Sequence, residues 1–526
     1  MKRQHTLMMV LLLAIAGSSF ATGGQEAMAD SAEVITVEFW AENAQYGTLD
    51  ADHPQMSAYA EQFGIVFESP QIPWNGGTDY LQQLRLRIAA GDLPDVFLPW
   101  GGIEAELIEN GAVADLAELV QEEMPVYYDN VPDEVWDYVK SLSPDGESIY
   151  FLPAVTFTPL GAMIRGDWLD RLGLDVPTTT DEYVAVLEAF RDEDANGNGD
   201  PNDELPTSGR EGGRWMDHLF APFGVAMTEG YPQWAIYDGE LQYSGVQPEM
   251  KAAVEWIRGL YADGLLDPET FINTGSVWSA KVRGNLTGNY YHGLHWSGSR
   301  IQPLYNSGIT EVEFTYLPVL DHPDYDGFLT TTEYRRPGYV FSAGMSEEAI
   351  RRTMHVFEFI NNPANTGVIA EGYEGLDYLV EDGEVVRLGI NELAALGTGY
   401  RPKIDAQIYQ SAESVIATQQ FNRELLDMED PSSEAVAAYE ALGNVIQLIE
   451  EYAEDEVESI AGQFIPPTIY EGYPDIRTHR LYQEYISKII IGDWEVDRFD
   501  EFVERWYDAG GAEVTARAQA AYEALQ

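Results

Sequence analysis

The chain has 526 residues, and its 89 Asp and Glu against 29 Lys and Arg give a formal net charge of -60 at pH 7. A chain this acidic repels polyanions, which argues against nucleic acid and anionic lipid as partners. It contains no cysteine, so disulfides and thiolate chemistry are excluded and stability has to come from buried cores. The length is sufficient for two or more domains, each with a sizeable core.

The N-terminus predicts export from the cytoplasm. Lys2 and Arg3 precede an apolar run over residues 7–16 and small residues follow, so residues 1–21 are predicted to form a secretory signal peptide. Residues 22–33 lack periodicity and are predicted to be a flexible lead-in. No later segment is apolar enough to cross a bilayer. A serine stands where a lipoprotein signal carries its lipidated cysteine, so we expect a periplasmic protein without that lipid.

Strand and helix patterns alternate in the next part of the chain. Residues 34–43 alternate apolar and polar side chains and predict a first strand that ends at Trp40. A helix that ends at Gly91 follows, and residues 95–100 are the next strand. Residues 148–174 predict strand, turn, strand and helix. This alternation is typical of α/β layers.

A helix is predicted after Pro177. Thr179 and Glu182 have the spacing of a capping box at its start. Later helices are predicted at 251–266, 346–362, 432–454, 480–492 and 500–525. Strand-like pieces lie between them, at 314–320 and 338–344. The chain is therefore expected to cross between lobes more than once.

The acidic loop at residues 192–206, DEDANGNGDPNDELP, predicts a calcium site. Calcium takes six to eight oxygen ligands, which loops supply from alternate positions, with a glycine at the sixth position for the sharp turn. One register begins at Asp194 and has Gly199 at the turn. Its oxygens come from Asp194, Asn196 and Asn198, and it is closed by Asp203 and Glu204.

A second register of the same loop begins at Asp192. Its oxygens come from Asp192, Asp194 and Asn196, with Gly197 at the turn and Asp203 at the twelfth position, where a bidentate acid belongs. A solvated acidic turn is the simpler explanation, because Asn, Asp and Gly are common in ordinary loops. The regular spacing favours calcium over that explanation.

Several segments together resemble one family, the extracellular solute-binding proteins of ABC importers, family 1, and in particular its large oligosaccharide- and alginate-binding branch. The segments that carry the resemblance are 84–97, 164–190, 194–206, 371–378 and 499–514. The resemblance implies a periplasmic-binding-protein-like α/β fold, with two lobes joined by a multi-strand hinge (type II). It also implies a ligand bound in the cleft, lobes that close on it, and a closed form that docks on a membrane permease.

The resemblance also implies lobe boundaries. The N-terminal lobe is expected at residues 34–155 and about 340–465, and the C-terminal lobe at about 156–339 and 466–526. Residues 148–169 look like the first hinge crossing and residues from 314 onward look like the second.

The family's calcium loop implies a specific ligand set in this chain. The expected ligands are Asp194, Asn196, Asn198, the carbonyl of Asp200, Asp203 and Glu204. This chain carries one extra residue between Gly199 and the final Asp–Glu pair, which departs from the family's pattern. The ion would be structural, because it would pin a loop and offset carboxylate repulsion.

Sugar sites combine stacking aromatic rings with acids, amides and arginine, and the chain has 31 Tyr and 12 Trp. Strand ends of α/β sheets line the ligand crevice, and nearby turns reach it. The candidate ligand residues are Trp40, Glu42, Trp74, Trp100, Tyr290, Tyr291, His295, Trp296, Glu333, Arg335 and Glu374. Each of them can instead be explained by packing in the core or at the rim.

Two smaller patterns remain open. His292 and His295 are three residues apart, but a pair without a third ligand is better explained by a structural or ligand-contacting role than by a metal site. Arg335 and Arg336 can clamp a uronate carboxylate, although the overall negative charge disfavours anions.

The sequence thus predicts the substrate-binding component of an ABC importer, a monomer that captures an oligosaccharide and does not turn it over. A secreted polysaccharide hydrolase or lyase is the competing enzyme function, because paired carboxylates are abundant. No HExxH, GxSxG or phosphate-binding glycine loop supports an enzyme. An acidic calcium-dependent adhesion protein would explain the loop but not the alternating strands and helices. A peptide-binding importer component is separated only poorly from a sugar-binding one by sequence.

Overall fold

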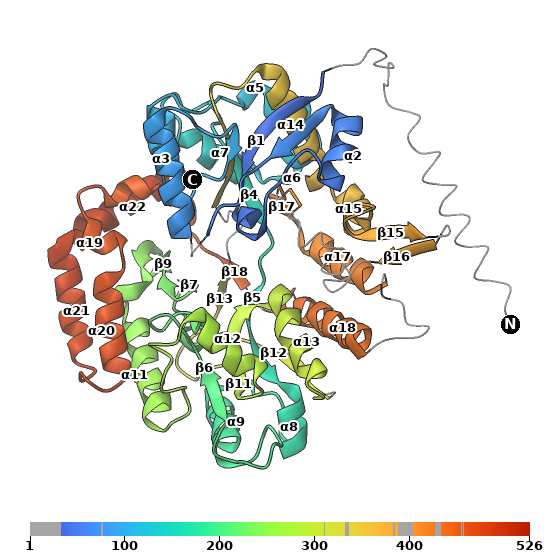
Figure 1. Ribbon diagram of the computed structural model, residues 1–526. Helices are drawn as coiled ribbons and strands as arrows, with labels where there is room; N and C mark the ends of the chain where they lie inside the picture. Colours follow the sequence, from blue (N-terminus) through green and yellow to red (C-terminus); the bar gives the residue numbers. More distant parts are fainter. Residues whose placement is uncertain are drawn as a thin grey trace.

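The computed structural model describes residues 33–74, 77–309, 311–331, 336–381, 384–387, 403–404, 406–424, 433–453 and 457–525, with residues 426 and 455. Two α/β lobes lie one above the other (Figure 1). Within these ranges, none of the helices combines the length and the apolar character that a membrane span requires. The predicted signal peptide, Glu333 and Arg335 lie outside the described residues.

The first lobe is built on a six-stranded sheet in the order β17-β4-β14-β3-β1-β2. Its strands are β1 (Ile35–Trp40), β2 (Ile65–Glu68), β3 (Val96–Phe97), β4 (Leu152–Thr156), β14 (Arg336–Phe341) and β17 (Tyr409–Gln410). β1 is parallel to β2 and β3, β17 is parallel to β4, and β14 runs antiparallel to both β3 and β4. Five of the six strands therefore point the same way, and their carboxyl ends meet at one edge.

The first lobe also contains helices and one hairpin. They are α2 (Pro54–Phe63), α3 (Thr78–Ala90), α4 (Glu104–Glu109), α5 (Ala117–Glu123), α6 (Pro125–Asn130), α7 (Asp133–Ser141), α14 (Glu347–Asn361), α15 (Thr366–Glu371), β15 (Tyr378–Glu381) and β16 (Glu384–Arg387). The predicted first strand and the helix that ends at Gly91 are confirmed. The predicted strand at 95–100 is shorter and spans Val96–Phe97.

The second lobe is built on a four-stranded sheet in the order β12-β5-β11-β6. Its strands are β5 (Leu160–Arg165), β6 (Leu205–Ser208), β11 (Thr287–Gly293) and β12 (Phe314–Leu317). β5 runs antiparallel to β11 and β12, and β6 is parallel to β11. β5 begins just after the chain leaves β4, so the carboxyl ends of β6, β11 and β12 lie at the edge that faces the first lobe.

The helices of the second lobe are α8 (Gly166–Leu172), α9 (Thr180–Asp192), α10 (Asp217–Phe220), α11 (Pro248–Ala262), α12 (Gly275–Arg283), α13 (Gly298–Asn306), α19 (Pro474–Arg477), α20 (Arg480–Ile490), α21 (Arg498–Trp506) and α22 (Ala512–Ala524). The capping box at the start of α9 is confirmed: the Thr179 hydroxyl accepts from the Glu182 amide, and the Glu182 carboxylate accepts from the Thr179 amide. This cap fixes the start of α9, and the acidic loop follows the end of the same helix at Asp192.

Short paired strands complete the second lobe: β7 (Met227–Thr228) with β8 (Tyr231–Pro232), β9 (Trp234–Tyr237) with β10 (Glu240–Tyr243), and β13 (Leu329–Thr331) with β18 (Val457–Ser459). The predicted closing helix at 500–525 is two helices, α21 and α22. Gly510 interrupts it at φ 110°, a conformation outside the helical range.

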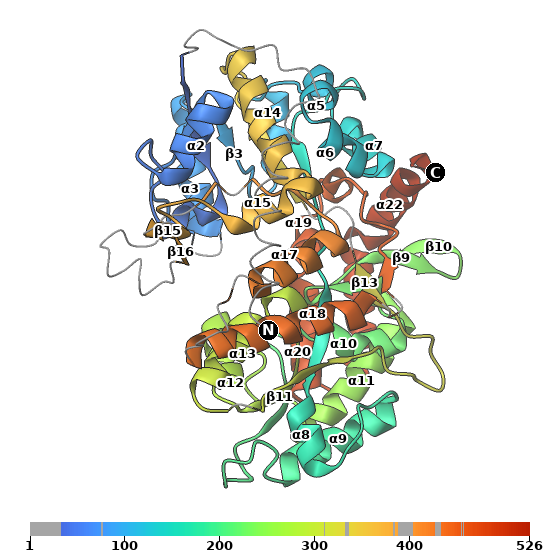
Figure 2. The ribbon, with the colours of Figure 1, turned by 90° about the vertical axis from the view of Figure 1, so that its right-hand side faces the viewer.

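Two elements in the range expected for the first lobe lie with the second lobe instead, and one of them is β18, which pairs with β13. Residues 340–465 were expected in the first lobe, but α18 (Ser433–Ala453), within that range, packs on α13 and β12 of the second lobe. Its Leu448 and Ile449 are buried in the core that contains Met163 of β5. Helix α17 (Ala412–Glu424) packs along α18, and both lie where the lobes meet (Figure 2). The lobe to which a long apolar helix belongs is decided by the core on which it packs and not by the elements that precede and follow it in sequence.

Among the elements that the structure describes, three successive pairs lie in different lobes. Residues 157–159 lead from β4 to β5, the segment from β12 through β13 leads back to β14, and β17 leads into α17. The first two passages coincide with the predicted hinge crossings. Together the three passages form the hinge side of the molecule.

Candidate functional site

The two sheets present their strand ends to each other. Carboxyl ends of β1, β3, β4 and β17 lie at the edge of the first sheet where the chain leaves for the second lobe, and carboxyl ends of β6, β11 and β12 lie opposite. Ligands of α/β proteins bind outside the carboxyl ends of strands, where backbone groups and loop side chains are free to make contacts. The space between these edges is the candidate ligand site.

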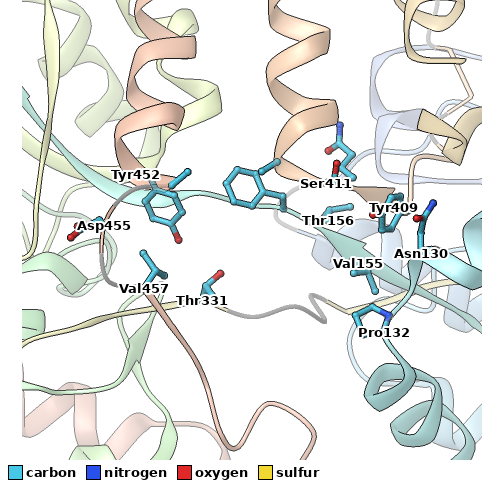
Figure 3. Close-up of a pocket in the computed structure, with 14 residues that line it drawn as sticks. Asn130, Pro132, Val155, Thr156, Thr331, Tyr409, Ser411, Tyr452, Asp455 and Val457 are labelled. Atoms are coloured by element: carbon cyan, nitrogen blue, oxygen red, sulfur yellow. The ribbon is translucent and has the colours of Figure 1, made fainter. Parts of the chain in front are cut away.

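A cavity of about 440 Å³ lies at the hinge side of this space (Figure 3). Aromatic rings and polar side chains share its lining. The residues are Asn130, Pro132, Val155, Thr156, Phe157, Thr331, Tyr409, Gln410, Ser411, Ala412, Tyr452, Ala453, Asp455 and Val457. Because they come from all three chain crossings, a change in the angle between the lobes changes the shape of this cavity.

Polar groups in the hinge cavity are held in place by hydrogen bonds. The Tyr316 hydroxyl donates to the Asp455 carboxylate at 2.7 Å, and the Val319 amide donates to the same oxygen at 3.2 Å. Burial raises the pKa of Tyr452 to about 12, so its hydroxyl stays protonated and remains a donor at neutral pH. None of the lining residues was predicted from the sequence.

The edge of the first lobe carries an uncharged aromatic pair. The rings of Trp74 and Trp100 lie 4.9 Å apart, and Trp74 also packs on Tyr80 at 5.4 Å. Gly77 lies beside them at φ +85°, and a Cβ there would come within 1.9 Å of the Trp100 indole nitrogen. Both predicted tryptophans are thus brought together, half-buried, against a turn that only glycine allows.

Trp40 and Glu42, also predicted as ligand contacts, lie apart from that pair. Trp40 is a buried core residue; its indole nitrogen donates to Glu38 at 2.9 Å and the Arg87 guanidinium lies over its ring. Glu42 is exposed in the short helix after β1. The strand end therefore supplies packing at Trp40 instead of a ligand surface.

The edge of the second lobe carries a group that we call the arginine–tryptophan cluster: Arg210, Trp215, Trp278, His292 and Arg300. The His292 ring is stacked between the indoles of Trp215, at 4.6 Å, and Trp278, at 5.4 Å. Parallel pairing sets Ser208 of β6 opposite Tyr290 of β11. Arg210 follows the end of β6 by two residues, and His292 lies two residues after Tyr290 in β11, so the two side chains meet.

The electrostatics of the cluster are unusual for so acidic a chain. Nη2 atoms of Arg210 and Arg300 lie 3.2 and 3.3 Å from the same atom, His292 Nε2. Burial, and then the two arginines, hold the pKa of His292 well below its usual range. The imidazole is therefore neutral and accepts from both guanidinium groups.

The other predicted residues of this lobe separate into buried and exposed sets. Tyr290 and Tyr291 are core residues, a correction to their predicted ligand role, since alternate side chains of β11 point into cores on both faces of the sheet. His295 and Trp296 follow β11, with their rings 4.3 Å apart and Trp296 37% exposed. Glu374 is exposed in the first lobe, on the turn before β15.

Sequence reasoning did not identify Arg210, Trp215, Trp278 or Arg300. The available signal was the segment GRWM at residues 213–216, where two scarce side-chain types adjoin after a buried strand. Arg214 in this segment lies over the Tyr231 ring and pairs with Glu211 and Glu229. An arginine-rich loop in an acidic chain is a stronger indicator than any single aromatic residue.

The acidic loop after α9 has the internal hydrogen bonds of an ordered turn. Asn196 Oδ1 accepts from the Asn198 amide at 2.9 Å, and Asn198 Oδ1 accepts from the Asp200 amide at 2.7 Å. Both carboxamide nitrogens donate to Asp203, at 2.8 and 2.7 Å. The loop thus gathers its oxygen-bearing side chains around Asp203.

Two oxygens of this loop are buried without a hydrogen-bond partner, Asp194 Oδ1 and Glu204 Oε2. Burial raises the pKa of Glu204, and the neighbouring carboxylates of Asp203 and Asp194 raise it further. Buried anionic oxygens that lack a donor are costly unless a cation compensates them, so the donor set fits a hard divalent ion. Among the described residues, His, Cys, Asp and Glu side chains alone form no metal-binding group of three, so such a site would depend on carboxamides and carbonyls.

Comparison with known proteins agrees with this architecture. The family model of bacterial extracellular solute-binding proteins matches residues 50–276. A fructooligosaccharide ABC transporter substrate-binding protein, FusA of Streptococcus pneumoniae, is 31% identical over 269 residues, which cover 48% of this chain and 48% of FusA. The alignment thus spans about half the length of that relative.

Solved structures match over nearly the whole chain. An HMO-binding ABC-transporter-associated solute-binding protein from Bifidobacterium longum infantis has a TM-score of 0.67 at 18% identity, covering 94% of this chain and 99% of that one. The alginate-binding protein AlgQ2, without calcium ion, has a TM-score of 0.62 at 20% identity, and the match covers 95% of this chain and 100% of AlgQ2. An EF-hand mutant of S. pneumoniae FusA in complex with fructo-nystose has a TM-score of 0.62 at 19% identity, and the match covers 93% of this chain and 99% of that one. The chain is therefore similar to bacterial extracellular solute-binding proteins over residues 50–276, and it shares the two-lobed fold of these solved structures.

Proposed function

We propose that this protein is the substrate-binding component of an ABC importer, which captures an oligosaccharide between its lobes and delivers it to a membrane permease. The observation that carries the proposal is the pair of facing strand edges with a cavity of about 440 Å³ at their hinge. FusA, the relative that matches half of this chain, is a fructooligosaccharide-binding component of such an importer. We further propose an extracytoplasmic monomer.

The side chains at the facing edges suit a sugar. Sugars offer apolar C–H faces and rings of hydroxyl groups, so aromatic rings and polar groups have to stand close together. The hinge cavity combines Phe157, Tyr409 and Tyr452 with Asn130 and Gln410. Trp74 and Trp100 from one edge and Trp296 from the other add ring surface.

Binding would act through the angle between the lobes. A ligand shifts an open–closed equilibrium only through contacts that the closed state makes and the open state lacks. The hinge cavity is lined from both sides of the hinge, so a bound sugar can favour one angle. Hinge closure of this kind uses a few residues at element ends, and here those ends are Thr156, Thr331 and Gln410.

Capture without turnover is favoured over hydrolysis. A glycosidase needs two carboxyl groups on either side of the scissile bond. Asp455 is the one carboxylate among the described residues that line the hinge cavity, and it already accepts two hydrogen bonds.

Calorimetry against a panel of oligosaccharides, followed by chromatography of the recovered sugar, tests this function. We expect binding of one sugar per chain and recovery of that sugar at its original length. Tyr409→Ala should weaken binding about tenfold through lost ring contact, whereas Tyr507→Ala, an exposed residue of the C-terminal helices, should not. A shortened product would reject the binding-protein function, and no binding to any glycan would reject the ligand class.

We also propose that the acidic loop holds a structural Ca²⁺. Asp194, Asn196, Asn198, the Asp200 carbonyl, Asp203 and Glu204 would hold the ion, which would supply positive charge and no chemistry. The unpartnered oxygens of Asp194 and Glu204 support the proposal. Two of the similar structures, AlgQ2 without calcium ion and the EF-hand mutant of FusA, point to the same kind of loop in relatives. A chelator should lower the melting temperature and added calcium should restore it; indifference to both would remove the site.

A further inference from the structure

Among the described residues, Arg300 is a buried cation without an acidic partner, although the chain has 89 acids. It is 8% exposed, and among the described residues its hydrogen bonds reach a carbonyl, a hydroxyl and an imidazole but no carboxylate. Its Nη1 donates to the Trp296 carbonyl at 2.8 Å, and its Nε has no hydrogen-bond partner. An unpaired buried charge is strongly destabilising, and a guanidinium does not lose its proton to avoid that cost.

Arg210 places a second positive charge beside Arg300. The Cζ atoms of Arg210 and Arg300 both lie 5.1 Å from the centre of the Trp278 ring, and both groups donate to the neutral His292. Burial lowers the pKa of both arginines, and the charge of Arg300 lowers that of Arg210 further. Stacking on Trp278 and Trp215 offsets part of the cost, but Arg210 Nε is also buried without a partner.

The one carboxylate that contacts Arg210 among the described residues comes from the rim of the site. Glu211 Oε1 lies 2.9 Å from Arg210 Nη1, and Glu211 Oε2 lies 3.2 Å from Arg214 Nη1. Its carboxylate thus bridges two arginines from outside, as a bound carboxylate would. Glu211 and Trp215 both have positive φ, 54° and 63°, and such strain in non-glycine residues gathers at ligand clamps.

We propose that the arginine–tryptophan cluster, with Arg214 at its mouth, is an anion subsite on the second-lobe wall of the ligand cleft. It takes a carboxylate of the bound oligosaccharide, a uronate-type substituent, which displaces the Glu211 side chain from Arg210 and Arg214. The paired N–H groups of guanidinium match the two oxygens of a carboxylate. Trp296, beside the cluster at the same edge, provides the ring on which that sugar stacks. This subsite rests on the proposed function.

The test compares two sugars that differ only in charge. Trigalacturonate and its fully methyl-esterified form are titrated into the full chain at fixed ionic strength. The acid should bind at least about tenfold more tightly than the ester. Arg210→Gln should abolish this preference, and Glu211→Gln should increase it, since it removes the competing carboxylate. Arg505→Gln, which changes an exposed arginine paired with Glu501, should leave the preference unchanged.

A second measurement tests whether the arginine–tryptophan cluster binds an anion in the absence of any sugar. Sodium sulfate, against sodium chloride at equal ionic strength, should produce a saturable change in tryptophan fluorescence that Arg210→Gln abolishes. Equal binding of acid and ester, or a Glu211→Gln variant that binds the acid more weakly, would overturn the subsite. Binding of neutral sugars alone would overturn it and leave the proposed function intact. If no glycan binds, the proposed function fails, and the sulfate response alone keeps or overturns the anion site.

Discussion

The acidic loop and the arginine–tryptophan cluster, both in the second lobe, have opposite unmatched charges. In the loop, Asp194 and Glu204 keep buried oxygens without a donor. In the cluster, Arg210 and Arg300 share one neutral imidazole. The chain has acids in excess, yet the hydrogen bonds of Arg300 to described residues reach no carboxylate. Each region is explained most simply by a partner of opposite charge that the described residues do not supply.

The largest expected effect concerns Asp217, a buried acid that follows Trp215 of the cluster closely in sequence. It is 2% exposed, and its pKa is raised to about 7, first by burial and then by Glu229, while Arg214 opposes the rise. A counter-ion to the arginines would have a depressed pKa instead. Asp217 is therefore not the missing partner of the cluster.

Asp217→Asn tests this assignment through the pH dependence of stability. The unfolded carboxyl ionises near pH 3.9 and the folded one near 7, so its stabilising contribution is complete below about pH 4 and is lost by pH 7. At 1.36 kcal/mol per pKa unit, the loss is on the order of 4 kcal/mol. The free energy of unfolding, measured with denaturant at pH 4.5 and pH 7.5, should rise in the variant relative to the wild type by an amount of that order. Parallel profiles would mean that Asp217 is ionised and does neutralise the arginines.

The next effect separates the two registers of the acidic loop. Both oxygens of Asp192 are already held by Arg191, at 2.7 and 2.8 Å, which leaves the register that begins at Asp194. Calcium at about 100 times its Kd stabilises by about 2.7 kcal/mol. Asp194→Asn should lose most of the calcium-dependent rise in melting temperature, and Asp192→Asn should keep it. The reverse result would assign the other register.

A smaller effect distinguishes ring contact from charge at the second-lobe edge. Trp296→Ala should weaken binding of the acidic and the esterified trimer equally, by about tenfold, because stacking on a sugar does not depend on its charge. Arg210→Gln should weaken only the acid. Tyr507→Ala, which removes an aromatic residue that is 47% exposed, is the matched control. Unequal loss in the tryptophan variant would place the carboxylate on Trp296 itself.

The smallest expected effect is that added salt changes the affinity for calcium and the affinity for an acidic sugar in opposite directions. The net charge of -60 attracts Ca²⁺ and repels an anionic sugar, and salt screens such long-range forces more than contacts between buried groups. Between about 0.05 and 0.5 M NaCl, calcium affinity should fall, whereas affinity for the acidic trimer should hold or rise a few-fold. A parallel fall of both in calorimetry would mean that the arginines act as ordinary surface charges.

The two regions also differ in how far the sequence reveals them. The acidic loop is contiguous, and its spacing is visible along 15 residues of chain. The first strand, the capping box of α9 and the successive strands β4 and β5 are equally visible in the sequence. Local patterns carry these features because the interactions that form them are local. The resemblance to a known family added the two-lobed arrangement.

The remainder of the site depends on register and tertiary packing. Arg210 meets His292 only because β6 and β11 pair in parallel with Ser208 opposite Tyr290, which no local pattern specifies. The hinge cavity draws on segments from Asn130 to Val457. Tyr290 and Tyr291 have the composition of a ligand site, but burial on both faces of the sheet makes them core. Composition identifies candidate types, and packing decides which of them a ligand can reach.

The position of β14 has a consequence for how the protein is made. This strand lies between β3 and β4 in the first sheet, yet the whole second sheet precedes it in the chain. During synthesis, the edges of β3 and β4 consequently wait unpaired until residue 336 has emerged, and unpaired strand edges invite aggregation. Pairing over so long a separation is slow. A nascent chain of this protein would therefore depend on a chaperone until the returning strand completes the sheet.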